Sequence, residues 1–154
     1  MSPGEGRDVS GPFVEGSNGP EAPGFLLWRV TLGWQRAMRA ALAPFGLTHV
    51  QYVLLSSLRW LETSAGPPSQ QRLAEHAGTD PMMTSQVVRR LVARSLVARG
   101  VDPADARVHL LSLSADGAAL VGSASVAVES ADRAYFAALG SSSDSFVRGL
   151  TRLL

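Results

Sequence analysis

Hydrophobic residues recur every three or four positions along much of the chain, which is the period of an amphipathic helix. Residues 25–45 carry one such stripe and residues 48–61 carry a second. Pro44 and Gly46 are typical of a helix end, and Thr48 is a good N-cap for the helix that follows. The pattern therefore predicts two long helices, and the Gly-Pro-Pro stretch after the second one ends it.

Two shorter helices are predicted next. Ser69 can cap a helix over residues 70–77, and Gly78 suits the left-handed residue that closes such a helix. Asp80 can cap the following helix, which we expect to run to about Arg94. Its expected buried stripe consists of Val87, Val88 and Leu91. Two short helices joined by a glycine-bearing turn make a helix-turn-helix.

A hairpin is predicted directly after these helices. Residues 96–101 and 107–113 have strand composition, and the Asp-Pro-Ala-Asp segment between them is a turn. Ser114 can cap a long helix to about Leu139. A last short helix contains Phe146, Val147, Leu150 and Leu153. The predicted fold class is mainly α with a small β-hairpin wing, a winged helix-turn-helix.

Composition separates the N-terminal residues from the rest. Residues 1–24 are rich in Gly, Pro, Ser and Glu and hold four acidic residues against one arginine. They bury too little apolar surface to offset the entropy of ordering, so we expect a disordered tail there and one folded domain over residues 25–154. That domain holds 13 arginines against nine acidic residues. A modest positive charge permits DNA binding without demonstrating it.

Several classes of protein are excluded by what the sequence lacks. It has no cysteine, and hence no disulfide or thiolate zinc site. No secretory signal or membrane span is evident, so a cytoplasmic protein without membrane contact is expected. The nucleophile elbow, the P-loop and the H-E-x-x-H motif are missing, and the three histidines are scattered. We therefore expect no enzyme, no catalytic residue, no cofactor and no metal.

Three stretches of sequence, taken together, have the order and spacing of a known family. They are Gln-Arg-Leu-Ala-Glu-His-Ala at 71–77, residues 83–91 leading to Leu-Val-Ala-Arg at 96–99, and residues 102–107 followed by Leu-Ser-Ala-Asp-Gly at 113–117. This arrangement resembles the MarR family of winged helix-turn-helix transcriptional regulators over roughly residues 28–120. The resemblance implies that the three stretches are the helix before the turn, the recognition helix with its exit, and the wing with the start of the fifth helix.

Two positions depart from the family pattern. Ser95 stands where the family usually has glycine, and we expect it to distort the end of the recognition helix slightly. Ala106 stands where a basic residue is common, which removes one contact to the DNA backbone. The second departure weakens the expected wing binding but leaves the fold unchanged.

Helical geometry identifies the candidate DNA-reading side chains. If the valine and leucine stripe faces the core, Ser85, Gln86 and Arg89 project from the opposite side. Met82 and Arg90 flank them. Gln pairs with adenine and Arg with guanine in the major groove, while Ser suits a base or a phosphate. The alternative is an ordinary amphipathic helix with a solvated polar face.

The wing and the helix before the turn supply further candidates. In the family, an arginine matching Arg107 reaches the minor groove and an aspartate matching Asp105 holds it; a simple surface ion pair is the alternative. Ser69 and Gln70 begin a helix whose N–H groups can bind a phosphate, although Ser69 as a cap alone is an equal reading. Arg99 is expected to be a structural or phosphate partner.

The first and last helices carry more apolar surface than a lone small domain can bury. The resemblance implies a homodimer built by residues 25–45 and 115–154, with residues 48–114 as the DNA-binding lobe. Two recognition helices would then lie about 34–36 Å apart and bind a pseudo-palindromic site in double-stranded DNA.

Family members often respond to small aromatic ligands. Residues that could line such a site are Trp28, Trp34, His49 and Tyr52. Packing in the dimer core is the alternative for these side chains, because aromatic residues at helical spacing are usually core. The resulting hypothesis is a homodimeric repressor, and the alternative is a winged-helix module that binds protein or a small molecule but not DNA.

Overall fold

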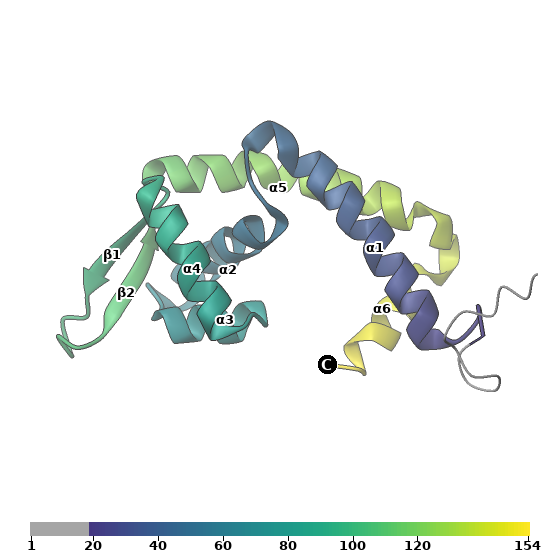
Figure 1. Ribbon diagram of the computed structural model, residues 1–154, viewed down its shortest axis with the longest axis horizontal. Helices are drawn as coiled ribbons and strands as arrows, with labels where there is room; N and C mark the ends of the chain where they lie inside the picture. The colour runs from purple at the N-terminus through teal and green to yellow at the C-terminus, as the bar shows by residue number, and fades with distance from the viewer. Residues whose placement is uncertain (1–18) are drawn as a thin grey trace, which may run out of the picture. The chain divides into compact units, whose positions relative to one another are not determined.

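The computed structural model describes residues 19–154, which form six α-helices and one two-stranded sheet (Figure 1). The elements are α1 (Pro23–Leu42), α2 (His49–Ala65), α3 (Gln70–Ala77), α4 (Pro81–Ala93), β1 (Val97–Val101), β2 (His109–Leu113), α5 (Ala115–Phe136) and α6 (Ser143–Thr151). Most of the tail predicted over residues 1–24 lies outside the described residues. Helix α1 begins at Pro23, slightly before the predicted start, because proline fits a first helical position where no N–H is needed.

The described residues divide into two compact units, with the boundary between Trp34 and Gln35 inside α1. The second unit has one hydrophobic core to which α2, α3, α4, both strands and α5 contribute. Its buried members are Leu42, Leu47, Leu54, Leu55, Leu58, Leu61, Leu73, Val87, Val88, Leu91, Leu96, Val97, Leu111, Val121 and Ala124. This core fixes α4 and the base of the hairpin against α2.

The helix starts predicted from single residues are confirmed. Thr48 forms a capping box, in which its Oγ1 accepts from the N–H of Gln51 (3.3 Å) and the Gln51 side chain accepts from the N–H of Thr48 (3.0 Å). Ser69 Oγ accepts from the backbone N–H of Arg72 (3.2 Å), and Asp80 Oδ1 accepts from that of Met83 (2.9 Å). Each cap satisfies an N–H that the helix leaves without a partner.

Helices α3 and α4 end in the same way but with different residues. In α4 the N–H of Leu96 donates to the carbonyl of Leu91 and the N–H of Ser95 to that of Val92, which is the Schellman arrangement. The left-handed position is held by Gly78 after α3, with φ +64°, and by Ser95 after α4, with φ +56°. The departure from the family pattern at Ser95 therefore leaves the helix end intact and places the strain in one backbone angle.

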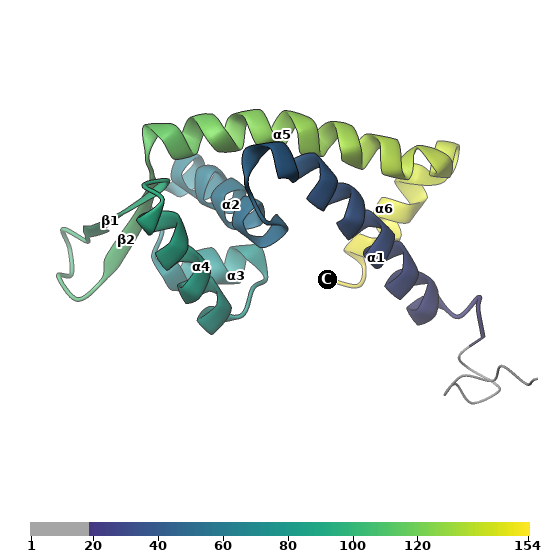
Figure 2. The same ribbon diagram turned by 45° about the horizontal axis from the view of Figure 1, so that its top comes forward.

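Strands β1 and β2 pair antiparallel, from Val97 opposite Leu113 to Val101 opposite His109. In both Figure 1 and Figure 2, this hairpin extends beyond α2, α3 and α4 at the end where α5 begins. Both strands start later than predicted. At β2 the reason is that residues up to Val108 belong to the turn, where the Val108 N–H donates to the carbonyl of Asp105.

Helix α5 starts at the predicted cap, with Ser114 Oγ accepting from the N–H of Gly117 (2.9 Å). It ends at Phe136, before the predicted Leu139, and a 3-10 segment, Ala137–Ser142, follows. Gly140 within that segment has φ +50°, a left-handed angle that interrupts the helix before α6. No helix in the described part of the chain has the length and hydropathy of a membrane span.

Candidate nucleic-acid interface

Helix α4 has one buried side and one exposed polar side. Val87, Val88 and Leu91 are buried as predicted, and all three belong to the core. On the other side Gln86, Arg89 and Arg90 are exposed, and together with Ala93 they line a shallow groove of about 350 Å³. The helix is therefore held rigidly while it presents an amide and two guanidinium groups outward.

The first turn of α4 carries the other predicted contacts. Met82 is 72% exposed, whereas the Ser85 side chain is less exposed and half-buried. Thr84, which the hydrophobic pattern did not indicate, is fully buried. Its hydroxyl donates to the carbonyl of Asp80 (2.8 Å), so the Thr79 hydroxyl supplies the proton of the bond between the two threonines (2.8 Å). These bonds fix the turn of the helix-turn-helix to the start of α4.

The start of α3 is attached to the wing. Ser69 caps α3 and pairs with Leu110 of β2 in an isolated antiparallel β-bridge. Gln70 accepts a hydrogen bond at Oε1 from Nη2 of Arg99 on β1 (3.0 Å). Arg99 is thus a structural partner, one of its two predicted roles, and it holds the Gln70 side chain at the N-terminal end of α3.

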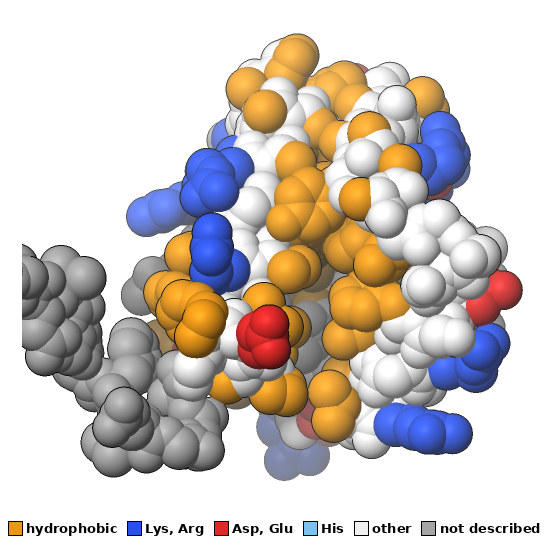
Figure 3. Space-filling model, turned by 90° about the vertical axis from the view of Figure 1, so that its right-hand side faces the viewer, with side chains coloured by type: hydrophobic (Ala, Val, Ile, Leu, Met, Phe, Trp, Pro, Cys, Tyr) orange, Lys and Arg blue, Asp and Glu red, His pale blue; other side chains and the backbone are white. Residues whose placement is uncertain are grey.

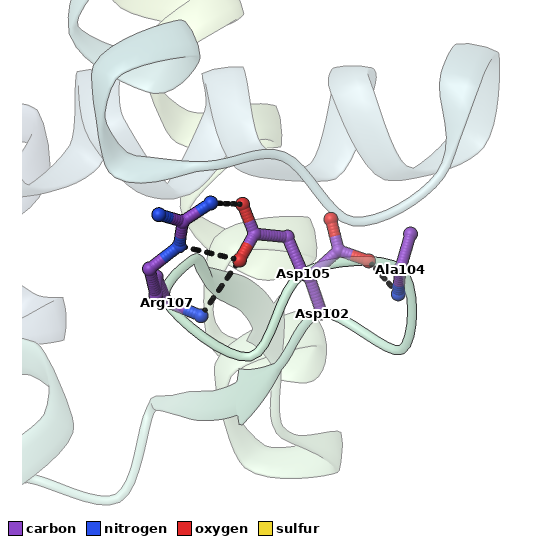
Figure 4. Close-up of polar contacts among 4 residues, drawn as sticks. All are labelled: Asp102, Ala104, Asp105 and Arg107. Atoms are coloured by element: carbon purple, nitrogen blue, oxygen red, sulfur yellow. Dashed lines mark hydrogen bonds and ion pairs between the residues drawn. The ribbon is translucent and has the colours of Figure 1, made fainter.

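At the tip of the hairpin, Asp105 binds Arg107 through both carboxylate oxygens (Figure 4). Oδ1 accepts from the backbone N–H (3.0 Å) and from Nε (3.1 Å) of Arg107, and Oδ2 accepts from Nη2 (3.4 Å). The Arg107 side chain is nonetheless 91% exposed. The hydrogen bonds from the Arg107 side chain and then from its backbone lower the pKa of Asp105 below its ordinary value. The pair therefore remains charged at neutral pH, with an oriented guanidinium facing solvent.

The predicted interface residues thus form three groups. The first group lies on α4 and consists of Met82, Ser85, Gln86, Arg89 and Arg90, of which the last three line one groove. In the second group, Ser69 and Gln70 are joined to the wing strands. Asp105 and Arg107 belong to the turn between β1 and β2. Figures 1 and 2 show this turn extending away from α3 and α4. An exposed helix flanked by an arginine-bearing hairpin is suited to a duplex, in which the major groove admits a helix and the minor groove admits a guanidinium.

The four aromatic candidates for a ligand site have different environments. Trp28, 62% exposed, and the half-buried Trp34 belong to the first unit. Tyr52 packs against the core, and its hydroxyl donates to Ser125 Oγ (3.4 Å). His49 lines a groove of the second unit at the start of α2. Tyr52 thus packs within its own chain, while both the ligand role and packing in a dimer core stay predictions for all four residues.

The remaining histidines lie apart from one another. His76 on α3 stacks on Trp60 of α2 with ring centroids 4.7 Å apart, and His109 is exposed at the start of β2. Residues 19–154 contain no group of three His, Cys, Asp or Glu residues placed to hold a metal ion.

Similarity to known proteins settles the family. The family model described as MarR family matches residues 47–109. A Bacillus subtilis protein described as the uncharacterized HTH-type transcriptional regulator YdcH is 43% identical over 138 residues, which cover 89% of this chain and 93% of that protein. The chain belongs to the MarR family. The resemblance inferred from the three sequence stretches is thereby confirmed.

Solved structures extend the likeness beyond residues 47–109. BpsR of Bordetella bronchiseptica, described in a study of how 6-hydroxynicotinic acid regulates its DNA binding, is 29% identical with a TM-score of 0.78, over 92% of this chain and 96% of that one. The transcriptional repressor CouR bound to a 23-mer DNA duplex is 26% identical with a TM-score of 0.78, over 88% of this chain and 95% of that one. The predicted mainly helical winged helix-turn-helix fold is thus confirmed.

Proposed function

We propose that this MarR-family chain is a homodimeric transcriptional repressor that binds a pseudo-palindromic operator through α4 and the wing. The observation that carries the proposal is the exposed face of α4. Gln86, Arg89 and Arg90 share a groove there while the opposite side of the helix is buried in the core. A base-reading side chain is useful only when its backbone is held in place, and this helix satisfies that requirement.

The residues of α4 suit direct reading of bases in the major groove. Arg89 can donate two hydrogen bonds to a guanine edge, and Gln86 can pair with adenine. Met82 offers an apolar contact to a thymine methyl group, and Ser85 can bond a base or a phosphate. Arg90 is better suited to a phosphate because it flanks this face. Base contacts would set the sequence preference, and phosphate contacts would set the register.

Wing and α3 contacts complete the proposed interface. A narrow minor groove concentrates negative potential and attracts the Arg107 guanidinium. Asp105 holds that guanidinium in one orientation before binding, which reduces the side-chain entropy lost on DNA. Ser69 and Gln70 are proposed to contact a phosphate at the start of α3, with Gln70 positioned by Arg99.

The dimer is proposed to form through the first and last helices, residues 25–45 and 115–154, with residues 48–114 as the DNA-binding lobe. Apolar residues of α5, the 3-10 segment and α6 line an open groove of about 560 Å³. They include Phe136, Leu139, Phe146, Val147 and Leu150. Figure 3 looks onto this end of the molecule, where hydrophobic side chains form open patches. Patches of this kind are typical of surfaces that a second copy covers.

A small aromatic acid is the proposed signal that releases DNA. This proposal is supported by the similarity to BpsR, whose DNA binding is regulated by 6-hydroxynicotinic acid. A ligand can lower DNA affinity only if it binds the DNA-incompetent arrangement of the lobes better than the competent one. Such a protein would repress in the absence of the acid and release its operator in its presence.

Selection of DNA from a random-sequence duplex pool tests this function with the full chain. We expect a two-fold symmetric site whose half-site centres are about 10–10.5 base pairs apart. Arg89→Ala should relax the preference at one base pair per half-site. Arg59→Ala, which removes an exposed arginine of α2 outside the proposed DNA contacts and dimer helices, should leave the selected site unchanged. A pool that yields no motif would contradict the proposal and favour a winged-helix module that binds a protein instead.

A further inference from the structure

The outer edge of β2 donates hydrogen bonds to groups outside the hairpin. The N–H of Ser114 donates to the carbonyl of Leu96 (3.1 Å), so these two residues form a hydrogen-bonded pair across the strands. Such pairs alternate with non-hydrogen-bonded ones in an antiparallel ladder, so the N–H of Leu113, opposite Val97, faces away from β1. A backbone N–H at a sheet edge needs an acceptor from another element or from water.

Glu62 of α2 supplies this acceptor. Both of its carboxylate oxygens lie 3.2 Å from the backbone nitrogen of Leu113, and both residues are half-buried. A hydrogen bond to an ionised carboxylate is roughly twice as strong as one between neutral groups. Two residues earlier on the same edge, the N–H of Leu111 donates to the carbonyl of Pro68 (2.8 Å). Strand β2 is thus attached to α2 at its last residue and to the segment before α3 at its middle.

The bond from Leu113 to Glu62 lies at the base of the wing, where a small movement is amplified at the tip. A strand rises by about 3.3 Å per residue, so the chain from Leu113 to Arg107 spans at most roughly 20 Å. A tilt of the hairpin by about 10° at Leu113 therefore moves Arg107 by up to roughly 3 Å, which is the length of a hydrogen bond. Asp105 orients the guanidinium within the turn (Figure 4), but it moves together with Arg107 and does not correct such a displacement.

We propose that Glu62 is a positioning residue for the wing, and that its bond to Leu113 sets the DNA preference at the place where Arg107 binds. The inference rests on the proposed function, because it names the residue that aims the wing at the minor groove. A·T-rich tracts have a narrower and more negative minor groove, which favours an inserted guanidinium. Helix α4 is held by the core, so the bases that it reads do not depend on Glu62.

Fluorescence anisotropy of the full chain on two duplexes tests the proposal. The duplexes share the bases selected for α4 and differ only in the flanks, where the wing is proposed to lie, with A·T pairs in one and G·C pairs in the other. We expect the wild-type chain to bind the A·T duplex about 5–10-fold more tightly. Glu62→Ala should reduce this ratio to less than about 2-fold. Because partial unfolding lowers the affinity for both duplexes equally, the ratio reports the placement of the wing and not stability.

Three further variants separate the bond from other effects of the substitution. Glu62→Gln keeps an oxygen that accepts from Leu113, so it should retain at least about half of the wild-type ratio. Arg107→Ala should itself bind the two duplexes within about 2-fold of each other, and adding Glu62→Ala should leave that ratio unchanged. Glu75 is an exposed glutamate of α3 whose carboxylate accepts from Gln71 on the same helix (2.9 Å). Glu75→Ala also removes one negative charge and should leave the wild-type ratio intact.

Amide hydrogen exchange followed by NMR measures the bond without DNA. The N–H of Leu113 should exchange at least about 10-fold faster in Glu62→Ala than in the wild type, and Glu62→Gln should restore most of the protection. An unchanged exchange rate, or a Glu62→Ala variant that keeps the wild-type preference for the A·T flanks, would overturn the inference. Equal affinity of the wild-type chain for the two duplexes would overturn it as well. Absence of DNA binding by the wild-type chain would instead contradict the proposed function.

Discussion

Replacing Ser95 with glycine should stabilise the folded chain by about 0.5–1 kcal/mol. Ser95 has φ +56° at the end of α4, a left-handed angle in which the Cβ of an L-residue crowds the backbone. The neighbouring hydrogen bonds from Leu96 to Leu91 and from Ser95 to Val92 involve only the backbone, so Ser95→Gly retains them. The substitution therefore relieves the strained angle without removing a helix-ending contact.

The magnitude follows from two opposing effects. A left-handed backbone costs a non-glycine residue roughly 1–2 kcal/mol. Glycine in turn loses more conformational entropy on folding, which opposes the gain by about 0.5–1 kcal/mol. Gly78 provides the reverse experiment, because it holds the equivalent position after α3 with φ +64° and nothing lies within 4 Å of an added Cβ. Gly78→Ser should therefore destabilise the chain by a similar amount.

Urea unfolding followed by circular dichroism measures both changes, at one protein concentration because dimerisation contributes to apparent stability. The midpoint should rise for Ser95→Gly and fall for Gly78→Ser, with the slope of each transition unchanged. Equal or lower stability of Ser95→Gly would refute the reasoning, because the positive φ would then carry no cost. Lower stability of Ser95→Gly together with the expected loss in Gly78→Ser would show that the Ser95 side chain makes a favourable contact that outweighs its strained angle.

Three other substitutions test separate parts of the account. Gly117→Ala at the start of α5 places a Cβ against the carbonyl oxygen of Leu96. The substitution should lower the unfolding free energy measured in urea by about 1–3 kcal/mol. Wild-type stability would show that α5 can move aside. Arg89→Ala should weaken operator binding by about 1–3 kcal/mol. The variant should also lose its preference at one base pair per half-site, which the anisotropy of binding to a set of substituted duplexes measures. Equal losses on every duplex would instead identify Arg89 as a phosphate contact. Because burial and then Arg39 lower the pKa of His49, the unfolded chain takes up the proton first as pH falls below about 6.5. The contribution of His49 to stability is therefore fully present above that pH and is lost as the pH falls through the lowered folded pKa. His49→Gln should flatten the decline in unfolding free energy between about pH 7.5 and 5. An unchanged pH profile would contradict this prediction.

Features set by local chemistry were predictable from sequence. Thr48, Ser69 and Asp80 cap their helices as expected, since each cap bond joins residues only three positions apart. The left-handed role of Gly78 follows from its lack of a Cβ. The exposed face of α4 follows from the 3.6-residue period, and the same spacing would have identified the buried Thr84 had polar residues been included in the stripe.

Features that depend on tertiary contacts were not predictable from the pattern. The bonds from Arg99 to Gln70 and from Arg94 to Gly46 join residues 29 and 48 positions apart. No periodicity indicates which arginine reaches which acceptor. The ligand candidates show the same limit, because an aromatic side chain alone does not distinguish the packed Tyr52 from the groove-lining His49. Arg39 lines the same groove as His49, and no spacing pattern in the sequence relates these two positions.

DNA affinity across a salt series tests the central claim most directly. With the duplex selected from the random pool, the affinity of the full chain should fall by about 10³–10⁵ between ~50 and ~200 mM salt if roughly 6–10 phosphates are contacted. That slope would be the electrostatic signature of arginines of α4 and the wing on the DNA backbone. An affinity that is independent of salt, or no binding at ~50 mM salt, would contradict the assignment of the exposed α4 face and the wing to DNA.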